Sequence, residues 1–138
     1  MNSETILLVG HGSREAAGND EILAFAQQWR QRQPGWSIEV CFIEFSEITM
    51  SEGLRRAAAQ SARVIVVPLI LNAAGHVKMD IPQAIDAARL KFPLVQFFYT
   101  PQLSACDQLL SVVKRRLKSA MQKLDMPDPT TTGVVLLG

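Results

Sequence analysis

Two histidines stand out in this sequence because each of them adjoins glycine. His11 lies between Gly10 and Gly12, and His76 follows Gly75. Neutral imidazole binds borderline divalent ions such as cobalt, nickel, iron and zinc, and its pKa near neutrality also suits proton transfer. A structural zinc site would have four ligands at short spacings, a pattern that is missing here. The pair therefore predicts a labile divalent metal site with open coordination positions, with a surface histidine in a turn as the alternative for His11.

Glu44 is the carboxylate best placed to join these histidines. It lies near the end of an apolar segment, residues 37–45, that is expected to run beside the segment leading to His11. A carboxylate there would serve as a third metal ligand or as a proton acceptor. The alternative is a surface glutamate at the end of a strand.

Alternating apolar and amphipathic segments predict the elements that position these residues. Strands are expected at residues 5–10, 37–45, 64–71 and 94–99, with helices at 15–32, 52–62 and 81–91 and a long fourth helix after residue 104. The run at 5–10 is typical of a strand buried on both faces in the middle of a parallel sheet. Pro68 is expected near the end of the third strand, because it cannot donate to a ladder.

Capping residues are expected at the start of two of these helices. Asp80 would cap the third helix, with Pro82 in its first turn, and Ser104 would cap the fourth. The core-facing stripe of the fourth helix would consist of Leu110, Val113, Leu117, Met121 and Leu124. Its basic outer face is expected to be solvated.

The β-α-β-α alternation predicts an α/β fold with three layers, α/β/α, around a four-stranded parallel sheet with right-handed crossovers. The first and third strands are the most apolar and should be central, which gives the order 2-1-3-4. Ligands bind such sheets at the carboxyl edge, where neighbouring connections diverge to opposite faces. His11 and His76 are therefore expected to converge on one crevice, where helix amino termini favour an anionic ligand.

Composition limits the class of protein. The 138 residues are 48% hydrophobic and 20% charged, enough for a single domain, expected at residues 1–125. There is no apolar stretch of membrane-spanning length and no signal peptide, so a cytoplasmic location is expected. With a net charge of +1, we expect no nucleic-acid or membrane partner. Cys41 and Cys106 lack metal-ligand spacing and are expected to be buried small residues, with no disulfide between them.

The last residues resemble the start of the chain. Residues 126–138 are expected to form a linker followed by an apolar segment, 132–138, that is similar to residues 5–10. This similarity predicts the first strand of a truncated second repeat of the same unit. An ordinary fifth strand is the alternative.

Three segments carry a resemblance to a known family. Residues 8–14 (LVGHGSR), 42–45 (FIEF) and especially 68–82 (PLILNAAGHVKMDIP) look like the signature segments of the sirohydrochlorin chelatases of the cobaltochelatase (CbiX) type, which have the class II chelatase-like fold. The resemblance spans residues 5–125. It implies a lyase that inserts a divalent metal, most commonly cobalt, into sirohydrochlorin on the route to cobalamin. Relatives insert iron for siroheme or nickel for a related cofactor.

The resemblance also implies roles for individual residues. The family's paired metal-binding, catalytic histidines fall on His11 and His76, and a supporting glutamate falls on Glu44. The metal is a substrate, and no organic cofactor is expected. Family members pair as homodimers of short chains or carry two such units in tandem, which would explain the repeat-like tail.

Residues beside the histidines are expected to bind the tetrapyrrole. Sirohydrochlorin carries many carboxylates, so Arg14 and Lys78 are candidates to bind its periphery. Gly12, Ser13 and Gly75 are the other candidates for binding the substrate, and glycine beside the imidazole would let a flat ligand approach the backbone closely. For Arg14 and Lys78, ordinary exposed loop charge is the alternative.

Two other function classes compete with metal insertion. A histidine phosphatase or mutase also places a histidine after its first strand, but Gly10 stands where that phosphoryl-transfer chemistry needs an arginine. A non-catalytic module that carries a metal or tetrapyrrole would need the same residues as the enzyme. An insertion assay separates this module from a chelatase.

Overall fold

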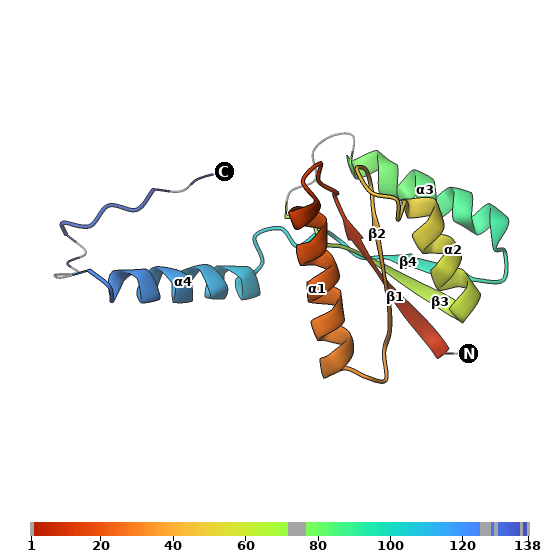
Figure 1. The fold of residues 1–138 in the computed structure, drawn as a ribbon, viewed down its shortest axis with the longest axis horizontal. Coiled ribbons are helices and arrows are strands. Elements are labelled where there is room, and N and C mark those ends of the chain that lie inside the picture. Colours follow the sequence, from red (N-terminus) through yellow and green to blue (C-terminus); the bar gives the residue numbers. More distant parts are fainter. Residues whose placement is uncertain (1, 72–76, 125–127, 129, 136, 138) are drawn as a thin grey trace. The chain divides into compact units, whose positions relative to one another are not determined.

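The structure, a computed structural model, describes residues 2–71, 77–124, 128, 130–135 and 137. The chain divides into two compact units, Met1–Ser104 and Ala105–Gly138. The first unit holds a four-stranded parallel sheet in the order β2-β1-β3-β4 (Figure 1). The strands are β1 (Asn2–Gly10), β2 (Ser37–Phe42), β3 (Ser61–Pro68) and β4 (Gln96–Tyr99). The predicted fold class and strand order are confirmed.

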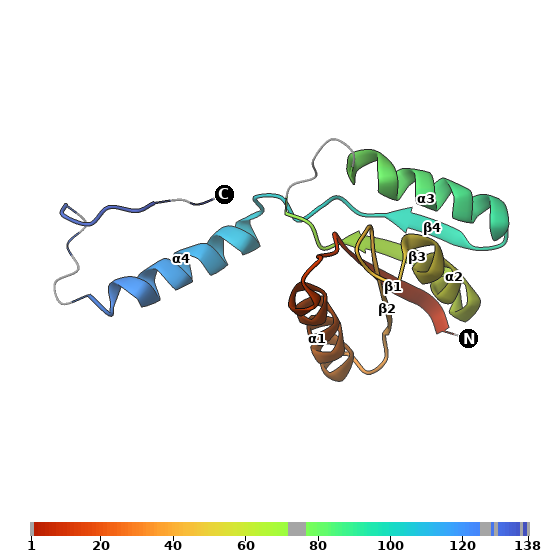
Figure 2. The ribbon, with the colours of Figure 1, turned by 45° about the horizontal axis from the view of Figure 1, so that its top comes forward.

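Three helices cover the sheet, α1 (Ala16–Arg32) on one face and α2 (Met50–Gln60) and α3 (Val77–Lys91) on the other (Figure 2). The alternation of side chains along β1 fits this arrangement, because successive residues of a strand point to opposite faces. Leu7 and Val9 belong to the cluster under α2 and α3, whereas Leu8 belongs to the cluster under α1. Both faces of the central strand are therefore buried.

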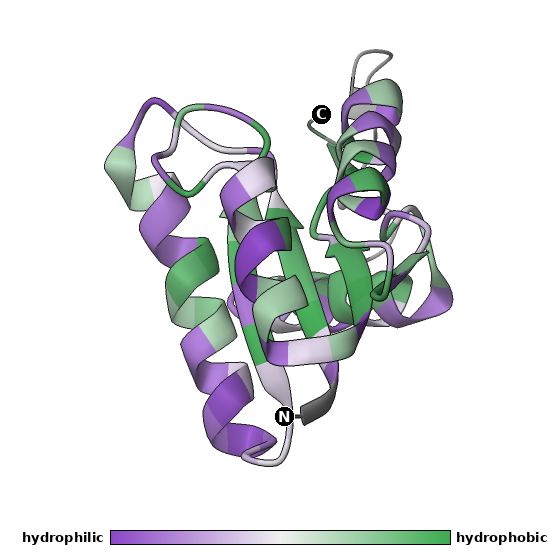
Figure 3. Cartoon of the chain, turned by 90° about the vertical axis from the view of Figure 1, so that its right-hand side faces the viewer, coloured by the Kyte–Doolittle hydropathy of each residue, from purple (hydrophilic) through white to green (hydrophobic). Residues whose placement is uncertain are grey.

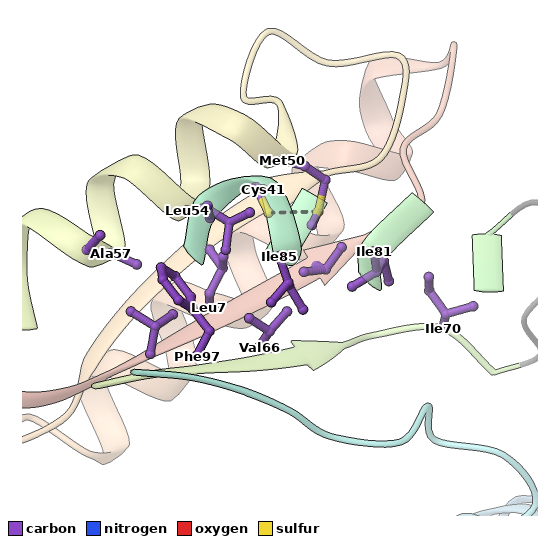
Figure 4. Packing of buried hydrophobic residues seen from close by; sticks show 14 residues of the cluster. Leu7, Cys41, Met50, Leu54, Ala57, Val66, Ile70, Ile81, Ile85 and Phe97 are labelled. Carbon is purple, nitrogen blue, oxygen red and sulfur yellow. Dashed lines mark hydrogen bonds between the residues drawn. The ribbon is translucent and has the colours of Figure 1, made fainter. Parts of the chain in front are cut away.

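The apolar strands form the interior of this unit. In Figure 3 the strands are mostly hydrophobic, whereas the helices also carry many hydrophilic turns. Figure 4 shows the larger cluster, in which Leu7 and Val66 of the sheet meet Leu54 of α2 and Ile85 of α3. All four side chains have exposed fractions of 2% or less. Burial of apolar side chains in this cluster is the main source of stability for the unit.

Two strands differ from the predicted boundaries in ways that bear on the site. Pro68 is the last residue of β3, as its missing N–H requires. β2 ends at Phe42 rather than at residue 45, because Phe45 has a positive φ of 53° and the chain turns there. Glu44 therefore lies in the loop that follows the strand.

Both predicted caps are wrong. Asp80 lies inside the first turn of α3, because that helix already begins at Val77. Ser104 has a positive φ of 51°, which a capping residue with extended backbone does not adopt, and Cys106 is the residue before α4 (Asp107–Met121). By contrast, Thr49 caps α2, accepting a hydrogen bond from the backbone N–H of Glu52 at 3.3 Å.

α4 belongs to the second unit, and within that unit none of its residues is buried. The predicted packing of its apolar stripe stays a prediction. Three of its apolar side chains, Leu110, Val113 and Leu117, are 39% to 49% exposed. In the tail, residues 132–135 form neither helix nor strand, and the predicted second repeat stays a prediction. Within the described part of the chain, every helix is too short or too polar to cross a membrane.

Candidate metal-binding site

The carboxyl ends of β1 and β3 form the edge at which the predicted site lies. These two strands pair side by side up to Val9 and Pro68, and the backbone N–H of Leu69 still donates to the carbonyl of Val9 at 2.8 Å. After β1 the chain passes to α1 on one face, and after β3 it passes to α3 on the other (Figure 2). The connections diverge here, which makes this the ligand-binding point of a parallel sheet.

His11 and Glu44 meet at this edge. The Nδ1 atom of His11 lies 3.5 Å from Oε1 of Glu44, with side chains 44% and 41% exposed. Nδ1 is also 3.2 Å from the carbonyl oxygen of Gly12. Acceptors at Nδ1 favour the tautomer that carries its proton there and keeps the lone pair of Nε2 directed elsewhere, as in metal sites where a carboxylate orients a histidine ligand. The structure thus brings together two of the predicted chemical residues.

Backbone hydrogen bonds hold the loops that carry these two side chains. The N–H of Ile43 donates to the carbonyl of Gly10, and the N–H of Glu44 donates to the carbonyl of His11, each at 3.0 Å. These bonds continue the pairing of β1 with β2 beyond the last residues of both strands. Neighbouring backbones, rather than side-chain contacts alone, therefore place the imidazole beside the carboxylate.

Gly12 is required by this packing. It has φ +97°, in the left-handed region, and a Cβ at this position would overlap the carbonyl oxygen of Glu44. Only glycine meets both conditions without strain. Its role in the structure is to let the two loops approach, which is distinct from its predicted contact with a macrocycle.

Arg14 and Phe45 form a second contact between the same loops. The guanidinium carbon of Arg14 lies 4.8 Å from the centre of the Phe45 ring, a cation–π arrangement. Phe45 is 45% exposed and has the positive φ noted above. Non-glycine residues with such backbone conformations cluster at functional sites. Arg14 thus lies on the same side of the molecule as His11 and Glu44, beside an exposed aromatic ring.

Asn19 is a residue of this region that the sequence analysis missed. It lies in the first turn of α1, where its side chain hydrogen-bonds to both Ser13 and Phe45. Ser13 itself accepts a bond from the N–H of Glu15 through its hydroxyl, at 3.1 Å. In the sequence, the only indication of this role is the position of an asparagine near the start of a helix, where its side chain commonly bonds to nearby backbone.

The remaining predicted residues are only partly described. His76 and Gly75 lie outside the described residues, so the convergence of the two histidines stays a prediction. Lys78 lies exposed in the first turn of α3, the helix that follows β3. Among the described residues, no group of three histidine, cysteine or carboxylate side chains is placed to hold a metal ion.

The cysteines do not contribute to the site. Cys41 is fully buried, and burial raises the pKa of its thiol to about 12, so it stays protonated. Its Sγ–H points to the sulfur of Met50 at 3.6 Å within the core (Figure 4). Cys106 is half-buried, so the predicted burial is confirmed for Cys41 and only partly for Cys106. Both thiols are free.

Gly10 also bears on the phosphatase alternative. A Cβ at this position would lie 2.8 Å from the Phe42 ring, which is itself buried. An arginine could not be accommodated here unless Phe42 moved. The position that phosphoryl transfer would need for its arginine is therefore closed by packing.

The sequence model of the CbiX family matches residues 5–120. The chain belongs to the CbiX family. The sirohydrochlorin cobaltochelatase of Priestia megaterium is 36% identical over 136 residues, 96% of this chain and 44% of that protein. The sirohydrochlorin ferrochelatase of the same organism is 30% identical over 115 residues, 83% of this chain and 43% of that protein. The chain thus spans less than half the length of these two relatives.

Solved structures agree with CbiX membership. The sirohydrochlorin chelatase SirB from Bacillus subtilis subspecies spizizenii, crystallised in complex with cobalt, has a TM-score of 0.76 and 30% identity, over 85% of this chain and 50% of SirB. A CbiX protein from Marinobacter aquaeolei has a TM-score of 0.74 at 21% identity, over 88% of this chain and 99% of that one. The second likeness supports the fold alone.

Proposed function

We propose that this CbiX chain forms a unit of a sirohydrochlorin chelatase that inserts a divalent metal, with cobalt as the expected ion, into the macrocycle. The observation that carries the proposal is the His11–Glu44 pair, 3.5 Å apart at the carboxyl edge of β1 and β2. The cobaltochelatase from Priestia megaterium and the cobalt complex of SirB support cobalt as the ion.

Insertion exchanges two protons for one metal ion. The two pyrrole N–H groups of the macrocycle each lose a proton, and the four nitrogens then bind the divalent ion. His11 and His76 would hold the ion loosely before transfer, since two imidazoles leave most coordination positions open. Glu44 would orient His11 through Nδ1 and accept one of the two pyrrole protons, and the second would pass to an imidazole or to water. In this proposal the two histidines hold the metal, and Glu44 orients His11 and takes part in proton removal.

The periphery of the substrate would be held by charge. Arg14 and Lys78 would pair with carboxylates of the tetrapyrrole, with Gly12, Ser13 and Gly75 close to the plane of the macrocycle. Stacking on Phe45 restrains the Arg14 guanidinium, so less side-chain entropy is lost when it binds a carboxylate. A second CbiX unit, from another copy of this chain or in tandem with it, would cover the open side.

The test is metal insertion by the purified chain. Sirohydrochlorin is mixed anaerobically with Co²⁺, Ni²⁺ or Fe²⁺, and the initial rate is followed by absorbance for the wild type, His11→Ala and His76→Ala. We expect insertion with at least one ion and near-complete loss in both variants, together with weaker cobalt binding by titration. Unchanged cobalt binding in both variants would refute the ligand assignment. A folded wild type that binds cobalt but inserts no ion would favour the carrier module.

A further inference from the structure

Asn19 connects the two loops that carry the predicted chemical residues. Its Oδ1 accepts a hydrogen bond from the N–H of Ser13 at 2.9 Å. Its Nδ2 donates to the carbonyl of Ser13 at 3.2 Å and to the carbonyl of Phe45 at 3.0 Å. Ser13 is two residues from His11, and Phe45 follows Glu44 directly. One amide thus bonds to the backbone on both sides of the His11–Glu44 contact.

The geometry of these loops explains why such a connection is needed. Gly12 and Phe45, one in each loop, both have positive φ values, 97° and 53°. For Phe45 this conformation costs energy, so surrounding interactions must maintain it. The bond from Asn19 ends on the carbonyl of Phe45 itself. Because α1 carries Asn19, the helix fixes the loop that follows β2, although the two are distant in sequence.

We propose that Asn19 is a positioning residue, whose amide joins the His11 loop to the Glu44 loop and so holds the Glu44 carboxylate beside the His11 imidazole. Asn19 does not touch substrate or metal in this proposal. Its effect on insertion acts through Glu44, and that part rests on the proposed function. Its effect on the loops does not.

The informative variant is Asn19→Asp, with Ala17→Asp as its matched control. Aspartate keeps the acceptor for Ser13 but loses both donated bonds and faces two carbonyl oxygens. A negative charge in the first turn of α1 favours the helix dipole, so the helix itself is not weakened. Ala17 is exposed in the same turn, and its variant adds the same charge away from the loops.

The first measurement is amide hydrogen exchange in the full chain, without metal or substrate. Loss of two hydrogen bonds predicts exchange about tenfold faster at Ile43 and Glu44 in Asn19→Asp. These are the amides that donate to the His11 loop. Ala17→Asp should leave their rates unchanged. Equal rates in the wild type and Asn19→Asp would overturn the connection, whether or not the chain inserts metal.

The second measurement is the kinetics of insertion. Asn19→Asp should lower kcat about tenfold and leave KM for sirohydrochlorin nearly unchanged, because misplacement of a catalytic group acts on the reaction step. In the double variant with Glu44→Gln, the Asn19 change should have no further effect. Additive losses would overturn positioning through Glu44. If the wild type inserts no ion, the proposed function fails and the exchange rates alone decide the connection.

Discussion

At the residue scale, the partly exposed contact between His11 and Glu44 would combine metal affinity with basicity in the proposed function. An imidazole and a carboxylate that are each about four-tenths exposed remain accessible to an ion and to a macrocycle. A fully buried pair would give little access to exchangeable metal. The openness of this pair therefore fits a metal that passes through the site as substrate.

The residue-scale prediction concerns Glu44→Gln. Removal of a general base lowers a rate by about 10²-fold or more, whereas loss of a group that orients a metal ligand weakens binding by about 10-fold to 100-fold. We expect the fold decrease in insertion rate, measured by stopped-flow absorbance, to equal or exceed the fold decrease in cobalt affinity, measured by titration. Glu47→Gln is the control, because Glu47 is an exposed carboxylate in the same loop. Equal rates in the two variants would contradict a role for Glu44.

At the element scale, the ends of β1 and β2 act together through their backbones. The hydrogen bonds from Ile43 and Glu44 to the β1 side require the loops to approach within backbone contact, and Gly12 permits this. The site is thus part of the sheet edge, continuous with the pairing of the two strands. A substitution in one loop is expected to displace the other.

Gly12→Ala tests this coupling of elements. The added methyl group would overlap the carbonyl of Glu44 at a positive φ, so we expect the free energy of unfolding to fall by about 2 kcal/mol or more. Urea denaturation followed by circular dichroism measures the change. Gly35→Ala is the control, since nothing lies within 4 Å of its Cβ position. If both variants unfold alike, the close approach of the loops is not as described.

At the scale of the whole molecule, one sheet edge offers one wall for a large flat substrate. Leu71 and Leu103 are exposed by 53% and 42% beside the end of β3. The backbone N–H of Leu103 donates to the carbonyl of Ile70, so both leucines belong to this edge. Exposed apolar side chains next to a ligand site are typical of surfaces that another chain covers.

We therefore predict that the chain forms a homodimer with twofold symmetry through this edge. Sedimentation velocity at micromolar concentration should give a dimer for the wild type and a monomer for Leu71→Asp, because a charge placed in an apolar interface disrupts it. Leu90→Asp should stay dimeric, since Leu90 is also exposed but lies in the last turn of α3, which leads to the start of β4, at the opposite edge of the sheet. A monomeric wild type that inserts metal at full rate would show that one unit suffices.

The sequence by itself determined the fold and much of the edge. The apolar runs at β1 and β3 identified the central strands, because strands buried on both faces must be apolar throughout, and the order 2-1-3-4 followed. The same reasoning placed His11 and Glu44 on neighbouring strand ends. The type of a residue and its position at the end of a strand can be read from local sequence. In a parallel sheet, residues that follow neighbouring strands then lie close together at one edge.

Only the tertiary structure decided how those residues are held. Asn19 and Phe45 were not predicted, because a hydrogen bond between a helix start and a distant loop depends on backbone positions that no periodic pattern encodes. The caps at Asp80 and Ser104 failed because capping ability is common and backbone conformation selects among candidates. The packing partner of the α4 stripe is a further property that sequence leaves open, because amphipathic spacing shows only that a face can be buried.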